Sequence, residues 1–228
     1  MTKVVIILQS RFNSKRLPGK ALKLINKIPI VVLSAKRLSN RGHKVIVATS
    51  NNKSDDKIVK ILIKNKIKYF RGSLNNVFSR YVEISKKYNK SDLIVRATAD
   101  NIFPDGTLVK LLVSQIKKKK LDYLGINHKL HLLPKGVSLE IFTVRKILNI
   151  DKLNLNKKHL EHVTLKIYEK NKKYHNNYIP KLIQKIDLSK IRVTIDTLKD
   201  YYFVKKIFKK IKNPYRISYS QLIKNINK

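Results

Sequence analysis

Residues 4–20 of the chain are Val-Val-Ile-Ile-Leu-Gln-Ser-Arg-Phe-Asn-Ser-Lys-Arg-Leu-Pro-Gly-Lys. The five apolar residues at the start predict a buried strand, and the polar residues that follow predict a loop at its end. The loop contains Ser14, Gly19 and four cations, which are Arg11, Lys15, Arg16 and Lys20. Guanidinium groups bind phosphate oxygens in a bidentate manner, and ligands of open α/β sheets bind beyond the carboxyl ends of strands. The stretch therefore predicts a polyphosphate site in a protein that handles nucleotides.

The loop matches neither of two common phosphate-binding motifs. It lacks the second glycine of a Walker A sequence and the spacing of G-x-G-x-x-G. A solvated basic turn is the alternative interpretation, because the whole chain is rich in lysine. Three of the ten arginines, Arg11, Arg16 and Arg37, nevertheless lie near this one predicted strand end, which favours phosphate binding.

Strand-like and helix-like segments alternate along the rest of the chain. We expect strands at 4–8, 44–49, 67–70, 93–97, 121–126, 139–142 and 192–195, and helices at 30–38, 57–65, 77–88, 108–116, 160–169 and 201–211. This alternation indicates βαβ units and a mainly parallel sheet flanked by helices. Nothing marks a domain boundary, so we expect one α/β domain over residues 1–228. Residues 148–178 break the rhythm, and we expect an arm within 148–180 that packs on a partner subunit.

The net charge of +38 is weak evidence for a nucleic-acid partner. The cations are 42 lysines and only ten arginines, and Lys, Asn and Ile together make 91 of the 228 residues. These three amino acids share A/T-rich codons, so genome composition explains all three, whereas nucleic-acid binding explains only lysine. The densest cluster, Lys117–Lys120, is expected to end a helix, where cations suit the helix dipole. We therefore expect no nucleic acid as partner.

Composition also limits the class of protein. The chain has no cysteine, which excludes disulfides, thiolate metal sites and cysteine nucleophiles. No apolar run approaches the roughly 18 residues of a membrane span, and the run Val4–Leu8 is too short for a signal peptide. We expect a cytoplasmic protein without a membrane partner.

Two aspartates follow predicted strands. Asp100 ends the segment Leu93–Asp100, and Asp196 ends the segment Arg192–Asp196. Both would lie at the same sheet edge as the basic loop, where they could hold one Mg²⁺, since hard cations prefer oxygen ligands. The alternative for Asp100 is a helix cap or turn residue before Asn101 and Pro104, and the alternative for Asp196 is capping, with Asp196 or Thr197 at the start of the helix at 201–211.

The histidines show no catalytic spacing. None of the six forms the His-Glu-x-x-His zinc motif, and the chain has no serine-hydrolase elbow. We expect them to be structural or surface residues.

Taken together, these residues resemble the cytidylyltransferase family that contains spore coat polysaccharide biosynthesis protein F and, more distantly, the CMP-KDO and CMP-sialate synthetases. The segment Gln9-Ser-Arg11-x-x-Ser14-x-Arg16-Leu-Pro-Gly-Lys20 is similar to the N-terminal signature of that family. Further similar blocks are Val47–Ser50 with Asp55-Asp56, Arg71–Ser73 with Val77 and Arg80-Tyr81, Ile94–Asp100, Gly136–Glu140, Glu161–Thr164 and Arg192–Asp200.

The resemblance implies a Rossmann-like nucleotide-diphospho-sugar transferase fold and a Mg²⁺-dependent reaction of CTP with a sugar. A sugar hydroxyl would attack the α-phosphate of CTP, and pyrophosphate would leave. The implied acceptor is an acidic sugar for surface polysaccharide biosynthesis, and the implied assembly is a homodimer. The implied metal ligands are Asp100 and Asp196, and the implied catalytic residues are Arg11, Lys20 and Asp100. The implied nucleotide-binding residues are Gln9, Arg11, Ser14, Arg16, Gly19, Lys20, Thr49, Arg80 and Thr98. The implied acceptor-binding residues are Asn101, Ser138 and Glu140.

The chain departs from the family pattern at three places, two of which bear on the acceptor. The family usually has Gly-Asp-Cys-Pro where this chain has Ala99-Asp100-Asn101-Ile102, and Asp where Ser138 and Asn76 stand. The changes at 99, 101 and 138 flank the expected sugar pocket, so they indicate an altered acceptor or weaker catalysis. The alternatives are a nucleotidyltransferase for another nucleotide or acceptor, a noncatalytic relative and, more remotely, a basic nucleic-acid-binding protein.

Overall fold

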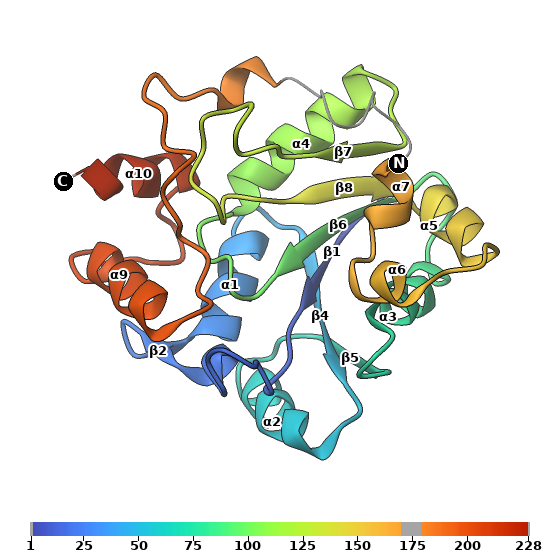
Figure 1. Cartoon of the computed structure of the whole chain (residues 1–228), viewed down its shortest axis with the longest axis horizontal. Coiled ribbons are helices and arrows are strands. Elements are labelled where there is room, and N and C mark those ends of the chain that lie inside the picture. The colour runs from blue at the N-terminus through green and yellow to red at the C-terminus, as the bar shows by residue number, and fades with distance from the viewer. Residues whose placement is uncertain (1, 170–178, 228) are drawn as a thin grey trace.

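The computed structural model describes residues 2–169 and 179–227. Its main sheet has six strands in the order β5-β4-β1-β6-β8-β7 (Figure 1). The strands are β1 (Val4–Gln9), β4 (Lys44–Ser50), β5 (Tyr69–Gly72), β6 (Leu93–Thr98), β7 (Tyr123–Gly125) and β8 (Glu140–Thr143). The first four pair in parallel, and β8 runs antiparallel to both β6 and β7. This confirms the predicted mainly parallel sheet.

Helices cover both faces of the sheet. Because side chains on a strand point alternately to opposite faces, β1 contributes to two hydrophobic clusters. The helices are α1 (Ile30–Ser39), α2 (Asp56–Lys64), α3 (Val77–Ser85), α4 (Gly106–Lys118), α5 (Val144–Asp151), α6 (Lys157–Glu161), α7 (Leu165–Tyr168), α9 (Leu198–Phe208) and α10 (Tyr219–Lys224). Ile6 and Leu8 pack with α1, α2, α4, α9 and α10, whereas Val5 and Ile7 pack with α3, α5, α6 and α7.

The short elements include a small hairpin, β2 (Leu24–Ile25) with β3 (Ile28–Pro29), which the sequence did not predict. The 3₁₀ helices are η1 (Lys20–Leu22), η2 (Lys53–Asp55), η3 (Pro180–Leu182) and η4 (Asn225–Asn227). Most of the predicted helices and strands correspond to observed ones within a few residues.

The predicted strand at 192–195 is wrong. This segment forms only an isolated bridge between Lys135 and Arg192, and the amide of Ile195 donates to the carbonyl of Asp100 at 3.0 Å. Both edges of β6 are already paired, with β1 on one side and β8 on the other, so no sheet edge is free there for a further strand. The segment nevertheless brings Asp196 beside Asp100.

The predicted helix at 160–169 is also wrong as a single element. It is two short helices, α6 and α7, separated at His162, whose backbone leaves the helical region with φ −100° and ψ 53°. Described parts of the expected arm at 148–180 pack against α3 of the same chain. Residues 170–178 of that arm lie outside the described residues.

Arg37 is a buried structural residue and does not belong to the basic loop. Its guanidinium donates to the carbonyls of Ile102 and Phe103, which follow β6, and to those of Pro214 and Ile217 near the C-terminus, at 2.7–2.8 Å. Burial lowers the pKa of Arg37 to about 10. The use of Arg37, together with Arg11 and Arg16, as support for a phosphate site at this strand end is therefore wrong.

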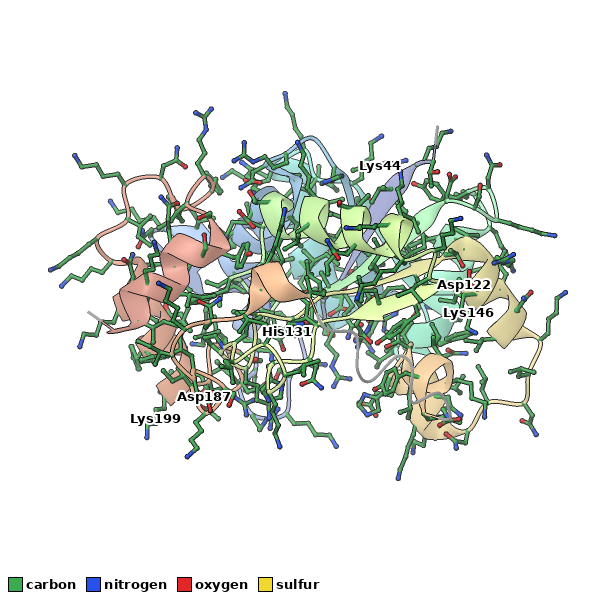
Figure 2. All side chains as sticks on the ribbon, turned by 90° about the horizontal axis from the view of Figure 1, so that it is seen from above. Lys44, Asp122, His131, Lys146, Asp187 and Lys199 are labelled. Atoms are coloured by element: carbon green, nitrogen blue, oxygen red, sulfur yellow. The ribbon has the colours of Figure 1, made fainter. Side chains whose placement is uncertain are left out.

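Charged side chains are spread widely over the molecule. Figure 2 shows nitrogen-ended side chains projecting on all sides of this view. In the described residues, no helix is both long and apolar enough to cross a membrane.

Candidate active site

A cavity of about 500 Å³ opens at the carboxyl ends of β1 and β6. Nine of the residues predicted from the sequence line it, which are Gln9, Arg11, Ser14, Arg16, Lys20, Arg80, Thr98, Asp100 and Asp196. The lining also includes Lys15 of the basic loop, and Arg96, Glu161 and His162, which belong to family-like blocks but had no role assigned from the sequence. The strand-end loops thus converge on one basic cavity.

The basic loop is held in place by its own backbone and by Asp55. The amides of Ser14 and Gly19 both donate to the carbonyl of Phe12 at 3.0 Å, and the amide of Phe12 donates to Asp55 at 2.6 Å. Gly19 has φ +69°, a conformation that favours glycine. Gly19 is therefore needed to turn the chain and lies outside the cavity lining.

Thr49, predicted to bind nucleotide, also lies outside the cavity lining. It is fully buried, and its hydroxyl donates to the Asp55 carboxylate at 2.8 Å. The same carboxylate accepts from the amide and hydroxyl of Ser50. Thr49 therefore acts on the loop indirectly, through the carboxylate that holds Phe12.

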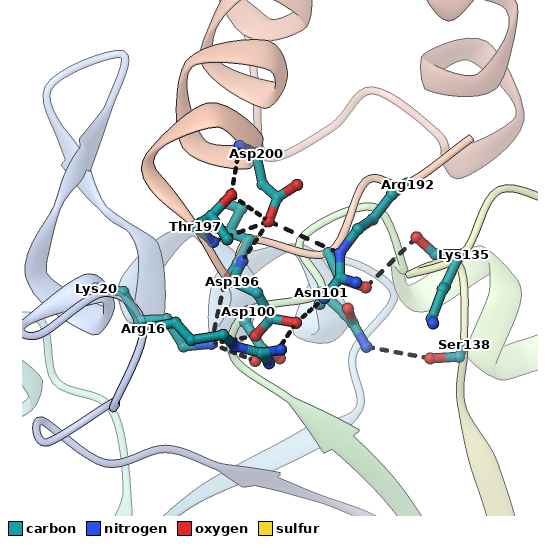
Figure 3. Close-up of polar contacts among 12 residues, drawn as sticks. Arg16, Lys20, Asp100, Asn101, Lys135, Ser138, Arg192, Asp196, Thr197 and Asp200 are labelled. Carbon is teal, nitrogen blue, oxygen red and sulfur yellow. Dashed lines mark hydrogen bonds and ion pairs between the residues drawn. The ribbon is translucent and has the colours of Figure 1, made fainter. Parts of the chain in front are cut away.

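The two strand-end aspartates share one cation. The ammonium group of Lys20 lies 2.7 Å from Asp100 and 3.0 Å from Asp196 (Figure 3). Asp196 also pairs with Arg16 at 2.9 Å and with Arg192. The side chains of Lys20 and Asp196 are only 14% and 12% exposed, so solvent screens this ion pair weakly.

The capping alternative holds for Thr197 rather than for Asp196. Thr197 caps α9, in a capping box with Asp200. The Asp196 carboxylate points instead toward Lys20, Arg16 and Arg192 (Figure 3).

Arg80 lines the cavity, but its guanidinium is largely occupied by the protein. It donates to the carbonyls of Ser73, Leu74 and Ala48 at 2.7–3.4 Å. Burial lowers the pKa of Arg80. Arg80 thus fixes the segment between β5 and α3 against the end of β4.

A second cavity of about 400 Å³ adjoins the first and shares Arg96 and Thr98 with it. Its lining includes the three residues predicted to bind the acceptor, Asn101, Ser138 and Glu140. The side-chain amide of Asn101 donates to the hydroxyl of Ser138 at 3.1 Å. Two of the positions that depart from the family pattern, Asn101 and Ser138, are therefore in direct contact.

The carboxylate of Glu140 is bound by protein groups. It pairs with Arg96 and accepts from the hydroxyls of Tyr123 and Thr164, each at 2.6 Å. Burial alone raises the pKa of Glu140, but Arg96 and the two hydroxyls outweigh it, and the net pKa lies below the ordinary value.

Two of the histidines have structural contacts, and a third lines the first cavity. His131 is buried and bonded to backbone at Asn127 and Ile179, and His159 pairs with Glu169 at 2.8 Å, as expected for structural residues. His162 lines the first cavity, and His175 lies outside the described residues.

A mainly parallel sheet with a basic cavity beyond its strand ends is typical of α/β proteins that bind ligands at the carboxyl ends of their strands. Residues 5–224 match the family model for cytidylyltransferases, and the chain belongs to that family. The family resemblance inferred from the sequence motifs is thus confirmed.

Individual relatives agree with this assignment. Spore coat polysaccharide biosynthesis protein SpsF of Bacillus subtilis is 28% identical over 235 residues, covering 100% of this chain and 95% of SpsF. A cytidylyltransferase from Leptospira borgpetersenii superimposes with a TM-score of 0.87 at 30% identity, covering 100% of this chain and 94% of that chain. A CMP:2-keto-3-deoxy-manno-octonic acid synthetase complexed with CTP shares the fold, with a TM-score of 0.63 at 14% identity over 91% of this chain and 99% of that chain.

Proposed function

We propose that the protein transfers CMP from CTP to a hydroxyl of a sugar, with Mg²⁺ as cofactor and pyrophosphate as the second product. The observation that carries this proposal is the convergence of Lys20, Asp100 and Asp196 in one basic cavity. The names of the relatives support the finer parts. One acts in spore coat polysaccharide biosynthesis and another is a synthetase of an acidic CMP-sugar, so we propose an acidic sugar for a surface polysaccharide as the acceptor.

The basic loop would bind the triphosphate. Arg11, Arg16 and Lys20 provide charge for the β- and γ-phosphates, and Ser14 adds a hydrogen-bond donor. Gln9 and Thr98 line the same cavity and would contact the rest of the nucleotide. Cations in this position also stabilise pyrophosphate as it leaves, which lowers the barrier electrostatically.

The carboxylates fit Mg²⁺. Oxygen atoms of Asp100 and Asp196 already converge on one cation, the Lys20 ammonium, and carboxylate oxygen is the donor that Mg²⁺ prefers. When bound, Mg²⁺ would supply Lewis-acid polarisation of the phosphate. In the free protein, Arg16, Lys20 and Arg192 balance the negative charge of these carboxylates.

The proposed reaction is an in-line displacement at the α-phosphorus. The acceptor hydroxyl oxygen forms a bond to phosphorus, the bond from phosphorus to the bridging oxygen breaks, and pyrophosphate takes the electron pair. The hydroxyl proton passes to solvent. Asn101 and Ser138 would orient the acceptor in the second cavity, so that positioning supplies much of the rate enhancement.

We propose that this activity resides in one cytoplasmic domain over residues 1–228 that works as a homodimer, with contacts from the 148–180 segment. Sedimentation of the purified protein tests the assembly. A monomer at micromolar concentration would contradict the proposed dimer. It would not bear on the proposed reaction, which is tested separately by pyrophosphate release.

Pyrophosphate release tests the activity. The protein is incubated with Mg²⁺ and CTP, ATP, GTP or UTP, against a panel of acidic, neutral and amino sugars. We expect release with CTP and one class of sugar, and loss of release when EDTA removes the metal. CTP binding without release on any sugar would indicate a noncatalytic relative. Release with another nucleotide only would overturn CTP as the substrate.

A further inference from the structure

Arg96 occupies the boundary between the two cavities. It lies on β6, two residues before the end of the strand, and lines both cavities. Among the described lining residues it is the only charged one that the two cavities share. A ligand that reaches from one cavity into the other must therefore pass beside Arg96.

Glu140 holds the Arg96 side chain in this position. The two residues face each other in the antiparallel register of β6 and β8, and their side chains are only 18% and 17% exposed. One oxygen of Glu140 accepts from Arg96, and the other accepts from Tyr123 on β7 and Thr164 before α7. Groups from three parts of the chain thus orient a single guanidinium.

Stability alone does not account for this pair. An ion pair removed from water costs desolvation, and apolar residues of similar volume are often as stable. A guanidinium carries five N–H groups, and besides Glu140 only the Tyr81 hydroxyl interacts with Arg96 by hydrogen bonding in the part of the chain that the structure describes. The Nε atom of Arg96 is buried and has no hydrogen-bond partner among the described residues. Burial lowers the pKa of Arg96, but the Glu140 carboxylate more than offsets this and keeps it charged.

The chemistry of the proposed reaction gives this boundary a role. The α-phosphate is the group that must meet both the nucleotide cavity and the acceptor, because the new bond and the broken bond share its phosphorus. We propose that Arg96 binds the α-phosphate at this boundary, and that Glu140 is the residue that positions Arg96. This inference rests on the proposed function and adds a contact to it.

Binding of partial ligands tests the inference without knowledge of the acceptor. CMP carries the α-phosphate, pyrophosphate represents the β- and γ-phosphates, and cytidine carries no phosphate. The comparison is between Glu140→Gln and the double variant Arg96→Met/Glu140→Gln, because the double variant leaves no buried charge unpaired and should fold. Calorimetry measures the three affinities, and thermal melting checks the fold.

We expect the CMP affinity to be about tenfold or more lower in the double variant than in Glu140→Gln, since a charge-assisted hydrogen bond to phosphate is lost. Affinities for pyrophosphate and cytidine should change less than about twofold. Unchanged CMP affinity would overturn the inference. An equal loss of cytidine affinity would also overturn it, because it would show that Arg96 contacts the nucleoside and not the phosphate. If the unaltered protein binds neither CMP nor pyrophosphate, the inference fails together with the proposed function.

A matched control and a double-mutant cycle complete the test. The control removes the surface pair Asp122–Arg145, whose residues lie outside both cavity linings, and should leave all three affinities unchanged. The cycle adds Arg96→Met alone, with binding again measured for CMP. If Glu140 acts by positioning Arg96, Glu140→Gln changes CMP affinity only while Arg96 is present. Equal effects with and without Arg96 would overturn the positioning role.

Discussion

The ammonium nitrogen of Lys20 lies 2.7 Å from Oδ2 of Asp100, although 80 residues separate the two along the chain. Parallel pairing of β1 with β6 explains this contact, because Gln9 and Thr98 are partners at the carboxyl ends of the two strands. The basic loop and Asp100 therefore follow neighbouring strands at the same edge of the sheet. Arg192–Asp196 then lies across them and adds the second carboxylate.

Replacing Asp100 by asparagine should lower kcat for pyrophosphate release by about 10²-fold or more. The change removes negative charge from the proposed metal site but keeps the size of the side chain. The measurement uses an acceptor that supports turnover, with Asp187→Asn as control, because Asp187 is exposed and lies outside both cavity linings. A rate near that of the unaltered protein would rule out the catalytic role of Asp100.

Replacing Arg16 by alanine should weaken CTP binding by about tenfold, measured by calorimetry with Mg²⁺ present. The side chain is 63% exposed and reaches Asp196 from the loop, so its loss removes phosphate contacts without opening the core. Lys64→Ala is the matched control, because it removes the same charge from the exposed side of α2. If both variants lose affinity equally, the effect comes from net charge and the assignment of Arg16 is wrong.

Replacing Glu140 by glutamine should lower the free energy of unfolding by about 3 kcal/mol at neutral pH, because Arg96 is left buried without its partner. The folded-state pKa of Glu140 lies below its ordinary value of 4.5. The stabilisation by Glu140 is therefore fully present above pH 4.5 and is lost as the pH falls through the folded-state pKa. Urea unfolding of both proteins across this range should show a constant difference at neutral pH and a narrowing one below 4.5. A difference that does not depend on pH would show that the Glu140 charge contributes nothing.

Replacing Gly136 by alanine should destabilise the protein more than replacing Gly42. Both glycines have positive φ, +117° and +85°, so each substitution costs about 1–2 kcal/mol in backbone strain. A Cβ atom at Gly136 would also lie 2.6 Å from the backbone nitrogen of Thr194, whereas one at Gly42 would meet no atom within 4 Å. We expect an additional cost of about 1–3 kcal/mol at Gly136.

Turnover should separate the two glycine variants as well. Thr194 lies two residues before Asp196, so a shift at Gly136 is transmitted to the second carboxylate. We expect lower kcat for Gly136→Ala and normal kcat for Gly42→Ala. Equal stability and equal turnover in the two variants would contradict the importance of this contact.

Much of the fold and part of the site could be predicted from local patterns. Val4–Leu8 and Leu93–Ala97 are continuous apolar runs, each followed by polar residues, and this is the pattern of a buried parallel strand with a functional loop. Lys20 and Asp100 could be placed at one sheet edge for that reason. Asp196 was expected beside Asp100 because it was predicted to end a strand. Its position is correct, but the segment before it is not a strand.

The remaining site residues depend on contacts that no local pattern reveals. Arg96 and Glu140 meet because β8 inserts beside β6 in antiparallel register, and β8 has only four residues. His162 reaches the cavity because α6 and α7 are separated by a turn at that residue. Arg37 could not be distinguished from Arg11 and Arg16 by sequence spacing, because its burial is a property of the packed core.

The four carbonyl bonds of Arg37 have a practical consequence for work with shorter versions of the chain. Two of the acceptors, Ile102 and Phe103, lie directly after Asp100 and Asn101, and the other two belong to Pro214 and Ile217. A version that stops before residue 213 would lose α10 and leave a buried guanidinium short of two acceptors. The segment that follows Asp100 would then lose its anchor to the C-terminal region. Pro214 and Ile217 are thus part of the scaffold of the active site, and the segment that contains them should be kept in any expressed fragment.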